Sequence, residues 1–284
     1  MCPHGRGQEL GAQMISIITA IYNQGEVNRL YYESLKAYTV NPFELIIIDN
    51  GSTDGSAEFF ESVGAKVIRN GANYSYPYCQ NRGIGVAQYD WLAFLNNDIV
   101  VSPQWDKRVM ESMQVNGLEV ATLCGIENAE DRTATRALKR RWRVLRNLLT
   151  LFGVHRVSLR LSHLLMYGNW VRHCERRYSR FRHKIKEGFV GCAIMMQRSA
   201  LDKVGLWDER VQSADYDLYL RTKDRSIRHG DIRPVHICLD VFVHHYIRVT
   251  LRARPPQFAD AYRLINLQDK WPKEYLVFLE SIDN

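Results

Sequence analysis

The chain has 284 residues, a formal net charge of +7, 46% hydrophobic residues and 24% charged residues, the composition of a globular protein with a buried core. This composition excludes a disordered chain, a collagen-like fibre and a disulfide-stabilised miniprotein. No run approaches the roughly 18 consecutive apolar residues of a membrane helix, and residues 1–13 lack the apolar core of a signal peptide, so we expect a cytoplasmic protein. The cysteines occur singly, and we expect reduced, mostly buried thiols.

The positive charge is concentrated in one segment. Residues 132–186 contain 16 Lys and Arg and a single acid, Glu175, whereas the rest of the chain contains 22 bases and 30 acids. An acidic body with one basic segment indicates a local contact with an anionic partner. No recognised nucleic-acid-binding motif accompanies the charge, so we do not expect a nucleic-acid partner.

Up to residue 125, short β-rich runs alternate with amphipathic stretches in chain order. The predicted strands are 14–21, 44–48, 65–69, 91–95 and 120–124. The predicted helices are 26–38, 54–63, 78–88 and 103–115. Repeated β–α units of this length predict an α/β fold, a Rossmann-like, mostly parallel sheet with helices on both faces.

Residues 132–186 interrupt this alternation with a predicted basic helical insertion. Apolar residues at spacings of 4, 3, 4 and 3 form one helical face, made of Leu138, Trp142, Leu145, Leu149 and Phe152. A second basic stretch follows at 171–186. Beyond it we expect strands at 189–196, 235–239 and 241–245, and helices at 199–204 and 257–269. The chain therefore divides into the segments 14–130, 131–187, 188–256 and 257–284.

Polar residues follow three of the predicted strands, at 22–24, 49–52 and 96–98. Open parallel sheets bind their ligands at these carboxyl ends. An isolated carboxylate in such a place, such as Asp98, can hold a hard divalent cation. Gly83-Ile84-Gly85 is not a dinucleotide fingerprint, because it lies late in a predicted helix and lacks the third glycine.

Six blocks of the sequence, taken together, resemble the family 2 glycosyltransferases with the GT-A fold. The blocks occur in the family's order, before and after the basic insertion. They are 15–24 (ISIITAIYNQ), 44–56 (ELIIIDNGSTDGS), 81–103 (NRGIGVAQYDWLAFLNNDIVVSP), 188–209 (GFVGCAIMMQRSALDKVGLWDE), 214–221 (ADYDLYLR) and 243–250 (VHHYIRVT).

The resemblance implies an inverting enzyme that moves a sugar from a nucleoside diphosphate sugar to a hydroxyl of a glycan or lipid-linked acceptor, in surface polysaccharide biosynthesis. Segment 14–130 would bind the nucleotide sugar, 188–256 would form the acceptor and catalytic half, and 257–284 would be a C-terminal helical segment. Asp49 would accept a hydrogen bond from the nucleotide base. The donor-binding residues implied are Thr19, Ala20, Tyr22, Asp49, Asn81 and Asn97.

The same resemblance implies a divalent metal, Mn²⁺ or Mg²⁺, bound to the diphosphate. Asp98 stands at the family's metal position, and His245 would be a further ligand. His244 ranks behind His245 because neighbouring residues of a strand face opposite ways. Asp215 matches the family's base, which takes the proton of the acceptor hydroxyl.

Three positions depart from the family pattern. Gln80 stands where an arginine is often found just before the helix asparagine, with Arg82 two residues on. Asn96 stands where the first acid of the metal motif is expected. Ala214 stands where an acid commonly precedes the base, so Asp217 could share or take over the role of Asp215. The departures at Asn96 and Ala214 leave a second hypothesis open, a catalytically silent member of the fold that binds nucleotide sugar or scaffolds a complex.

Two interpretations of the basic insertion also remain open. In one, its apolar face lies in a membrane and its bases contact anionic headgroups, which would place the protein on the inner face of the cell membrane. In the other, the apolar face packs on the catalytic domain and the bases contact an anionic acceptor.

Overall fold

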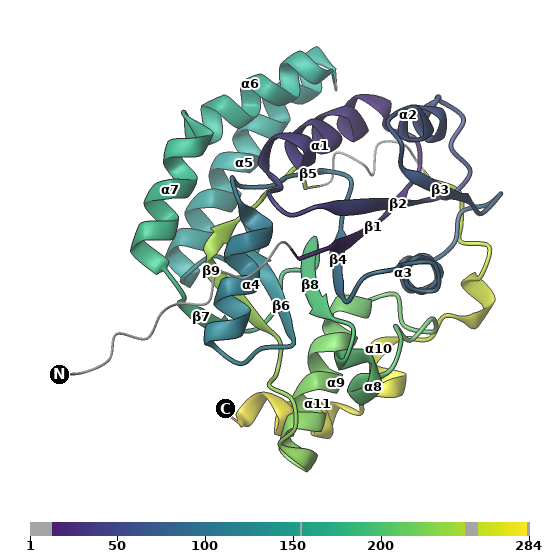
Figure 1. The fold of residues 1–284 in the computed structure, drawn as a ribbon, viewed down its shortest axis with the longest axis vertical. Coiled ribbons are helices and arrows are strands. Elements are labelled where there is room, and N and C mark those ends of the chain that lie inside the picture. Colours follow the sequence, from purple (N-terminus) through teal and green to yellow (C-terminus); the bar gives the residue numbers. More distant parts are fainter. Residues whose placement is uncertain (1–12, 154, 248–254, 283–284) are drawn as a thin grey trace.

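A computed structural model describes residues 13–153, 155–247 and 255–282. Its main strands are β1 (Ile15–Ile21), β2 (Phe43–Asp49), β3 (Lys66–Arg69), β4 (Trp91–Leu95), β6 (Val120–Cys124), β7 (Ile185–Glu187), β8 (Ala193–Gln197) and β9 (His236–Phe242). They form one eight-stranded sheet in the order β3-β2-β1-β4-β8-β6-β9-β7, with helices against both faces (Figure 1). The expected α/β architecture is confirmed.

Strand direction changes at the centre of this sheet. Strands β3, β2, β1 and β4 run parallel, as do β6 and β9, whereas β8 lies antiparallel between β4 and β6. Strand β7 pairs antiparallel with β9 at the edge. Because β8 runs against its neighbours, its first residues lie at the same edge as the last residues of β4. Residues 191 and 192 therefore join the edge where we expect the site.

Four helices alternate with the first strands, as predicted. They are α1 (Gly25–Tyr38), α2 (Ser56–Ser62), α3 (Tyr76–Ile84) and α4 (Trp105–Val115). Gly83 of α3 packs directly on β1, since a Cβ at this position would overlap Ile18 Cγ2 and lie 3.2 Å from its Cγ1. This glycine therefore serves close helix–sheet packing.

The basic insertion forms three helices, α5 (Arg132–Phe152), α6 (Arg156–Tyr167) and α7 (Trp170–Phe181), which lie together at one side of the molecule (Figure 1). Trp142 of α5 is only 3% exposed, and its Nε1 donates to the carbonyl of Ile247 at 3.4 Å. Leu138 and Leu145 pack against the same core. The interpretation that this face lies in lipid is therefore wrong for Trp142, which protein covers, and Leu138 and Leu145 are partly buried against the same core. The side chains of Leu149 and Phe152 lie outside the described part of the chain.

The prediction of one helix over 257–269 is also wrong. Beyond α8 (Ala200–Val204) and α9 (Ala214–His229), the chain continues through a 3₁₀ turn (Ala261–Arg263) into α10 (Leu267–Lys270) and α11 (Lys273–Ser281). The amide of Ala259 donates to the carbonyl of Asn73, and Asp260 accepts two hydrogen bonds from Ser75. These long-range contacts replace the local hydrogen bonds that a helix would need.

No helix among the described residues is both long and apolar enough to cross a membrane. The expectation about residues 1–12, and positions 248–250 of the last motif block, fall outside the described part of the chain.

Candidate active site

A second, two-stranded sheet brings together Asp98 and His245, which are far apart in the sequence. Strand β5 (Ile99–Val100) pairs antiparallel with β10 (His244–His245), so that His245 lies opposite Ile99. The amide of Tyr246 donates to the backbone carbonyl of Asp98 at 2.9 Å. His245 Nε2 lies 3.0 Å from Asp98 Oδ1. Main-chain pairing thus fixes the contact between the two predicted metal ligands.

Glu127 and Cys192 complete this cluster, and the sequence analysis did not predict either. Glu127 Oε1 contacts His245 Nδ1 directly. Ligand atoms of Glu127, Cys192 and His245 all lie within 4.8 Å of one another. Glu127 follows the carboxyl end of β6, and the Cys192 carbonyl accepts from the amide of Asn96 at 2.9 Å. Applying the strand-end argument to β6 as well would have identified Glu127.

The cluster has the donor chemistry of a site for a hard divalent cation. Burial opposes protonation of His245, but the carboxylates of Asp98 and Glu127 outweigh it and hold the imidazole pKa well above its ordinary value. A positive charge is therefore favoured between these two acids, and a bound cation would replace that proton. Glu127 Oε2 is buried without a hydrogen-bond partner among the described residues, so one carboxylate oxygen is available. Burial raises the pKa of Cys192 to about 12, so the thiol stays neutral.

Asp215 lines a cleft of about 550 Å³ next to this cluster. The cleft is formed by Glu127, Asn128, Gly188, Phe189, Val190, Gly191, Asp215, Tyr216 and Tyr219. Asp215 stands in the first turn of α9, where its Oδ1 accepts from the amide of Tyr216 at 2.9 Å. Burial raises the pKa of the Asp215 carboxyl above its ordinary value, which favours a proton-accepting role.

Gly191 is the residue that leaves room for the Asp215 carboxylate. A Cβ at position 191 would lie 2.8 Å from Asp215 Cγ and closer still to Oδ2, whereas ordinary contacts lie at 3.4–4 Å. The structure thus brings Asp215 and Glu127, the latter in contact with His245, to the walls of one cleft.

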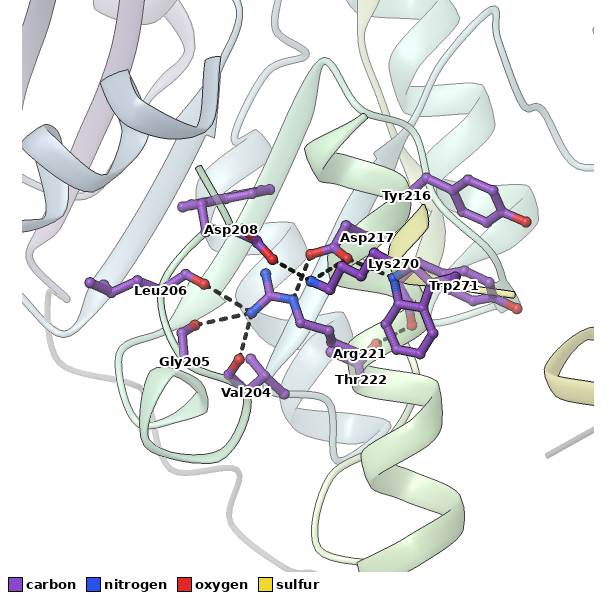
Figure 2. A network of polar contacts seen from close by, with 12 residues as sticks. Val204, Gly205, Leu206, Asp208, Tyr216, Asp217, Arg221, Thr222, Lys270 and Trp271 are labelled. Atoms are coloured by element: carbon purple, nitrogen blue, oxygen red, sulfur yellow. Dashed lines mark hydrogen bonds and ion pairs between the residues drawn. The ribbon is translucent and has the colours of Figure 1, made fainter. Parts of the chain in front are cut away.

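Asp217, the alternative base, lies in a different environment. Figure 2 shows its carboxylate surrounded by three donors. Lys270 Nζ lies 2.6 Å and Trp271 Nε1 2.8 Å from Oδ1, while Arg221 Nε lies 2.8 Å from Oδ2. Asp217 is completely buried, and it is absent from the lining of the cleft. These contacts attach α10 to α9 and occupy both carboxylate oxygens of Asp217.

Three expected donor-binding residues use their side chains for contacts within the protein. Thr19 Oγ1 and the hydroxyl of Tyr31 are hydrogen-bonded at 2.6 Å in the core. Asn97 Nδ2 donates to Asn28 Oδ1 at 2.7 Å. Asn81 bonds to both the carbonyl and the amide of Trp207, at 2.9 and 3.0 Å. In this structure the side chains of Thr19, Asn97 and Asn81 are therefore hydrogen-bonded within the protein.

The other donor-side predictions lie at the expected sheet edge. Asp49 is the last residue of β2, and its buried carboxylate accepts from the amide of Ser52 at 3.0 Å. Ala20 lies in β1, Tyr22 follows it directly, and both are partly exposed. The carbonyl of Ile21 accepts from the amide of Asn50 at 2.9 Å, which holds the ends of β1 and β2 together.

His244 points away from the cluster of its neighbour. It is fully buried, and its Nδ1 lies 3.0 Å from the hydroxyl of Tyr167 in α6. The rings of Trp142, His163 and Tyr246 surround it at centroid distances of 4.4–5.2 Å. The structure therefore does not bring His244 to Asp98. Instead, His244 connects β10 to the basic insertion, which supports the strand that carries His245.

Comparisons with known proteins match the part of the chain that carries most of these residues. The family model described as Glycosyl transferase family 2 matches residues 16–205. The glycosyltransferase YibD of Escherichia coli K12, itself described as uncharacterized, is 34% identical over 111 residues, covering 38% of this chain and 32% of YibD. The chondroitin synthase of Escherichia coli is 29% identical over 109 residues, covering 36% of this chain and 16% of the synthase.

The chain spans about a third of the length of three curated relatives that it matches. Among solved structures, a mannosyltransferase from Pyrobaculum calidifontis, in complex with GDP-Man and Mn²⁺, is similar with a TM-score of 0.49 and 11% identity, covering 82% of this chain and 60% of that one. The match to the family model runs from β1 to the end of α8 and takes in Asp49, Asp98, Glu127 and Cys192. This chain therefore belongs to glycosyl transferase family 2.

Proposed function

We propose that this protein is an inverting glycosyltransferase that moves a sugar from a nucleoside diphosphate sugar to a hydroxyl of a glycan or lipid-linked acceptor, in surface polysaccharide biosynthesis. The observation that carries this proposal is one cleft lined by two chemically different groups. Asp215, whose pKa is raised by burial, lines this cleft, and so does Glu127, which contacts His245. Transfer to a hydroxyl needs a proton acceptor near a site that stabilises the departing diphosphate.

In this proposal, Asp215 accepts the proton of the acceptor hydroxyl as that oxygen attacks the sugar from the side opposite the leaving group. Gly191 leaves the space in which the carboxylate stands. Phe189 and Tyr216 are stacked, with ring centroids 5.3 Å apart, in the lining of the same cleft. Such aromatic faces suit the apolar face of a sugar ring, which supports a carbohydrate acceptor. Asp49, at the end of β2, would accept a hydrogen bond from the nucleotide base.

Asp98, His245 and Glu127 would hold Mn²⁺ or Mg²⁺. A bound divalent ion supplies positive charge to the diphosphate leaving group. Glu127 would provide the second carboxylate that is missing at Asn96, and its buried, unpartnered Oε2 supports this assignment. Glu127, which follows the end of a different strand, would thus replace the carboxylate that is missing at Asn96. We place the protein in the cytoplasm, on the inner side of the membrane that carries the acceptor.

The test compares Asp215→Asn with Asp217→Asn in an assay of nucleoside diphosphate release over a panel of donors with Mn²⁺. We expect Asp215→Asn to keep donor affinity and to lower turnover by about 10²–10⁴-fold, since only the proton acceptor is lost. Asp217→Asn is the matched control, and we expect it to lower the melting temperature while the folded fraction still turns over. Equal turnover of Asp215→Asn and the unaltered protein would overturn the base assignment. Donor binding without any turnover of the unaltered protein would favour a silent, nucleotide-sugar-binding member of the fold.

A further inference from the structure

Helix α6 carries apolar residues on two faces. Its inner face is buried against the core through Leu159 and Met166. Its outer face is apolar at spacings of 4, 3 and 1, the pattern of one helical stripe. The outer residues and their exposed fractions are Val157 78%, Leu161 53%, Leu164 56% and Leu165 48%. A single exposed apolar residue is ordinary, but a contiguous stripe about 12 Å long indicates an interaction surface.

Helix α6, which carries the stripe, lies at the edge of the molecule (Figure 1). Arg156 and Arg160 of α6 both bond to Glu33 of α1, at 3.0 and 2.6 Å. Arg141 of α5 donates to the carbonyl of Leu165 at 2.6 Å. Val144, one turn further along α5, is 56% exposed. These contacts attach α6 to its neighbours and leave its apolar outer face toward solvent.

Two of the helices that contact α6, which are α5 and α7, are strongly basic. Glu175 is the single acid of the insertion, and Arg108 pairs with it at 2.7 Å. Eight exposed arginines of α5 and α7 have no acidic partner among the described residues. They are Arg132, Arg136, Arg140, Arg141, Arg143, Arg172, Arg176 and Arg180. A second copy of this chain docking through α6 would bring two such basic surfaces together, which Coulomb repulsion disfavours. The apolar stripe and the positive charge of α5 and α7 together favour a partner that is both apolar and anionic.

We propose that α6 is a membrane-docking helix whose outer face enters the headgroup boundary of an anionic bilayer, while the arginines of α5 and α7 contact the lipid phosphates. An apolar helical face with surrounding bases has the chemistry of an interfacial helix. This inference deepens the proposed function, because a lipid-linked acceptor would lie in the same bilayer. It rests on the proposed function only in its statement about the acceptor. The aromatic contacts of His244 connect this surface to the strand that carries His245.

Co-sedimentation of the full chain with vesicles tests the proposal without requiring transfer activity. The vesicles contain either phosphatidylglycerol mixed with phosphatidylcholine or phosphatidylcholine alone, each at low and high salt. We expect binding to the anionic vesicles that weakens as salt rises. The double variant Leu161→Asp/Leu164→Asp should lower the partition coefficient at least about tenfold, through lost apolar burial and added negative charge. Arg140→Gln/Arg143→Gln should lower it about tenfold at low salt and little at high salt.

Matched control variants distinguish the effect of the stripe on vesicle binding from the effect of changing any exposed apolar or basic residue. Val115→Asp changes an apolar residue that is 66% exposed on α4, and Lys107→Gln/Lys273→Gln removes two exposed bases outside the insertion. Both should bind vesicles like the unaltered protein, and all variants should keep its melting temperature and nucleotide affinity. Negligible binding to both vesicle types would overturn the proposal, as would full binding by the double leucine variant. A dimer that the leucine variant dissociates would show that a second copy covers the face. If the unaltered protein bound anionic vesicles but showed no turnover, the result would count against the proposed function and not against the membrane-docking proposal.

Discussion

The substitution Gly191→Ala gives the sharpest test of the cleft geometry. The new Cβ would lie 2.8 Å from Asp215 Cγ and closer to Oδ2, against ordinary contacts of 3.4–4 Å, so the carboxylate has to retreat by about 1 Å. A displacement of this size at a reacting group costs about 100-fold in rate. We therefore expect turnover to fall about 100-fold while donor affinity stays unchanged. Nucleoside diphosphate release and calorimetric titration of the donor measure the two quantities.

Two other glycines provide matched controls. Gly85→Ala adds the same methyl group where the nearest atoms are 3.6 Å away, so turnover should not change. Gly83→Ala meets Ile18 inside the core and should lower the melting temperature, with no effect on the chemistry of the folded fraction. The double variant Gly191→Ala/Asp215→Asn should be no slower than Asp215→Asn alone, because both changes act on one group. Unaltered turnover of folded Gly191→Ala would refute the placement of Asp215, and so would strictly additive losses in the double variant.

Two further predictions concern charge in the site. Asp98→Ala should abolish the increase in donor affinity that Mn²⁺ produces, while the melting temperature of the metal-free protein stays nearly unchanged. Titration of the donor with and without Mn²⁺ measures the affinity. Equal Mn²⁺ dependence in the variant and the unaltered protein would exclude Asp98 as a ligand. Burial raises the pKa of Asp215, so kcat/KM should rise with pH through a limb that lies above the ordinary aspartate range, and a limb near the ordinary pKa would contradict the buried, proton-accepting carboxylate. The same raised pKa favours folding below the unfolded-state pKa of Asp215, a contribution that is lost as pH rises through the folded-state pKa.

Much of the fold was predictable because its signals are local. Residues 45–48, within the segment 44–48 that is predicted as a strand, form a continuous apolar run. In β2 the side chains of Ile46, Ile47 and Ile48 are completely buried, as in a strand that is covered on both faces. The Gly83-Ile84-Gly85 sequence did not fit a dinucleotide fingerprint because of its position and its missing third glycine. The close approach of Gly83 to Ile18 shows the packing role that this glycine serves. The long helix over 257–269 was predicted wrongly because Asp260 and its neighbours take their hydrogen-bond partners from residues near Asn73, which no local pattern reveals.

The candidate site also has features that the sequence predicts and features that only the tertiary structure decides. The sequence by itself determined which residues could act, since Asp49 and Asp98 follow recognisable strands and Asp215 lies in a distinctive motif. It also determined that the insertion is basic and helical. Only the tertiary structure decided that Glu127 lies beside His245 and that Asp217 is neutralised by Lys270 and Arg221.

The apolar residues of the insertion show the physical reason most clearly. Trp142 and Leu161 both belong to amphipathic patterns, and one of the two interpretations of the sequence took the face of Trp142 as the lipid-binding one. In the structure Trp142 is 3% exposed and Leu161 is 53% exposed. Helical periodicity specifies which residues share a face, but it does not specify what that face meets. Which apolar face is covered by protein and which is left to a partner depends on how distant segments pack, and only the folded chain decides that.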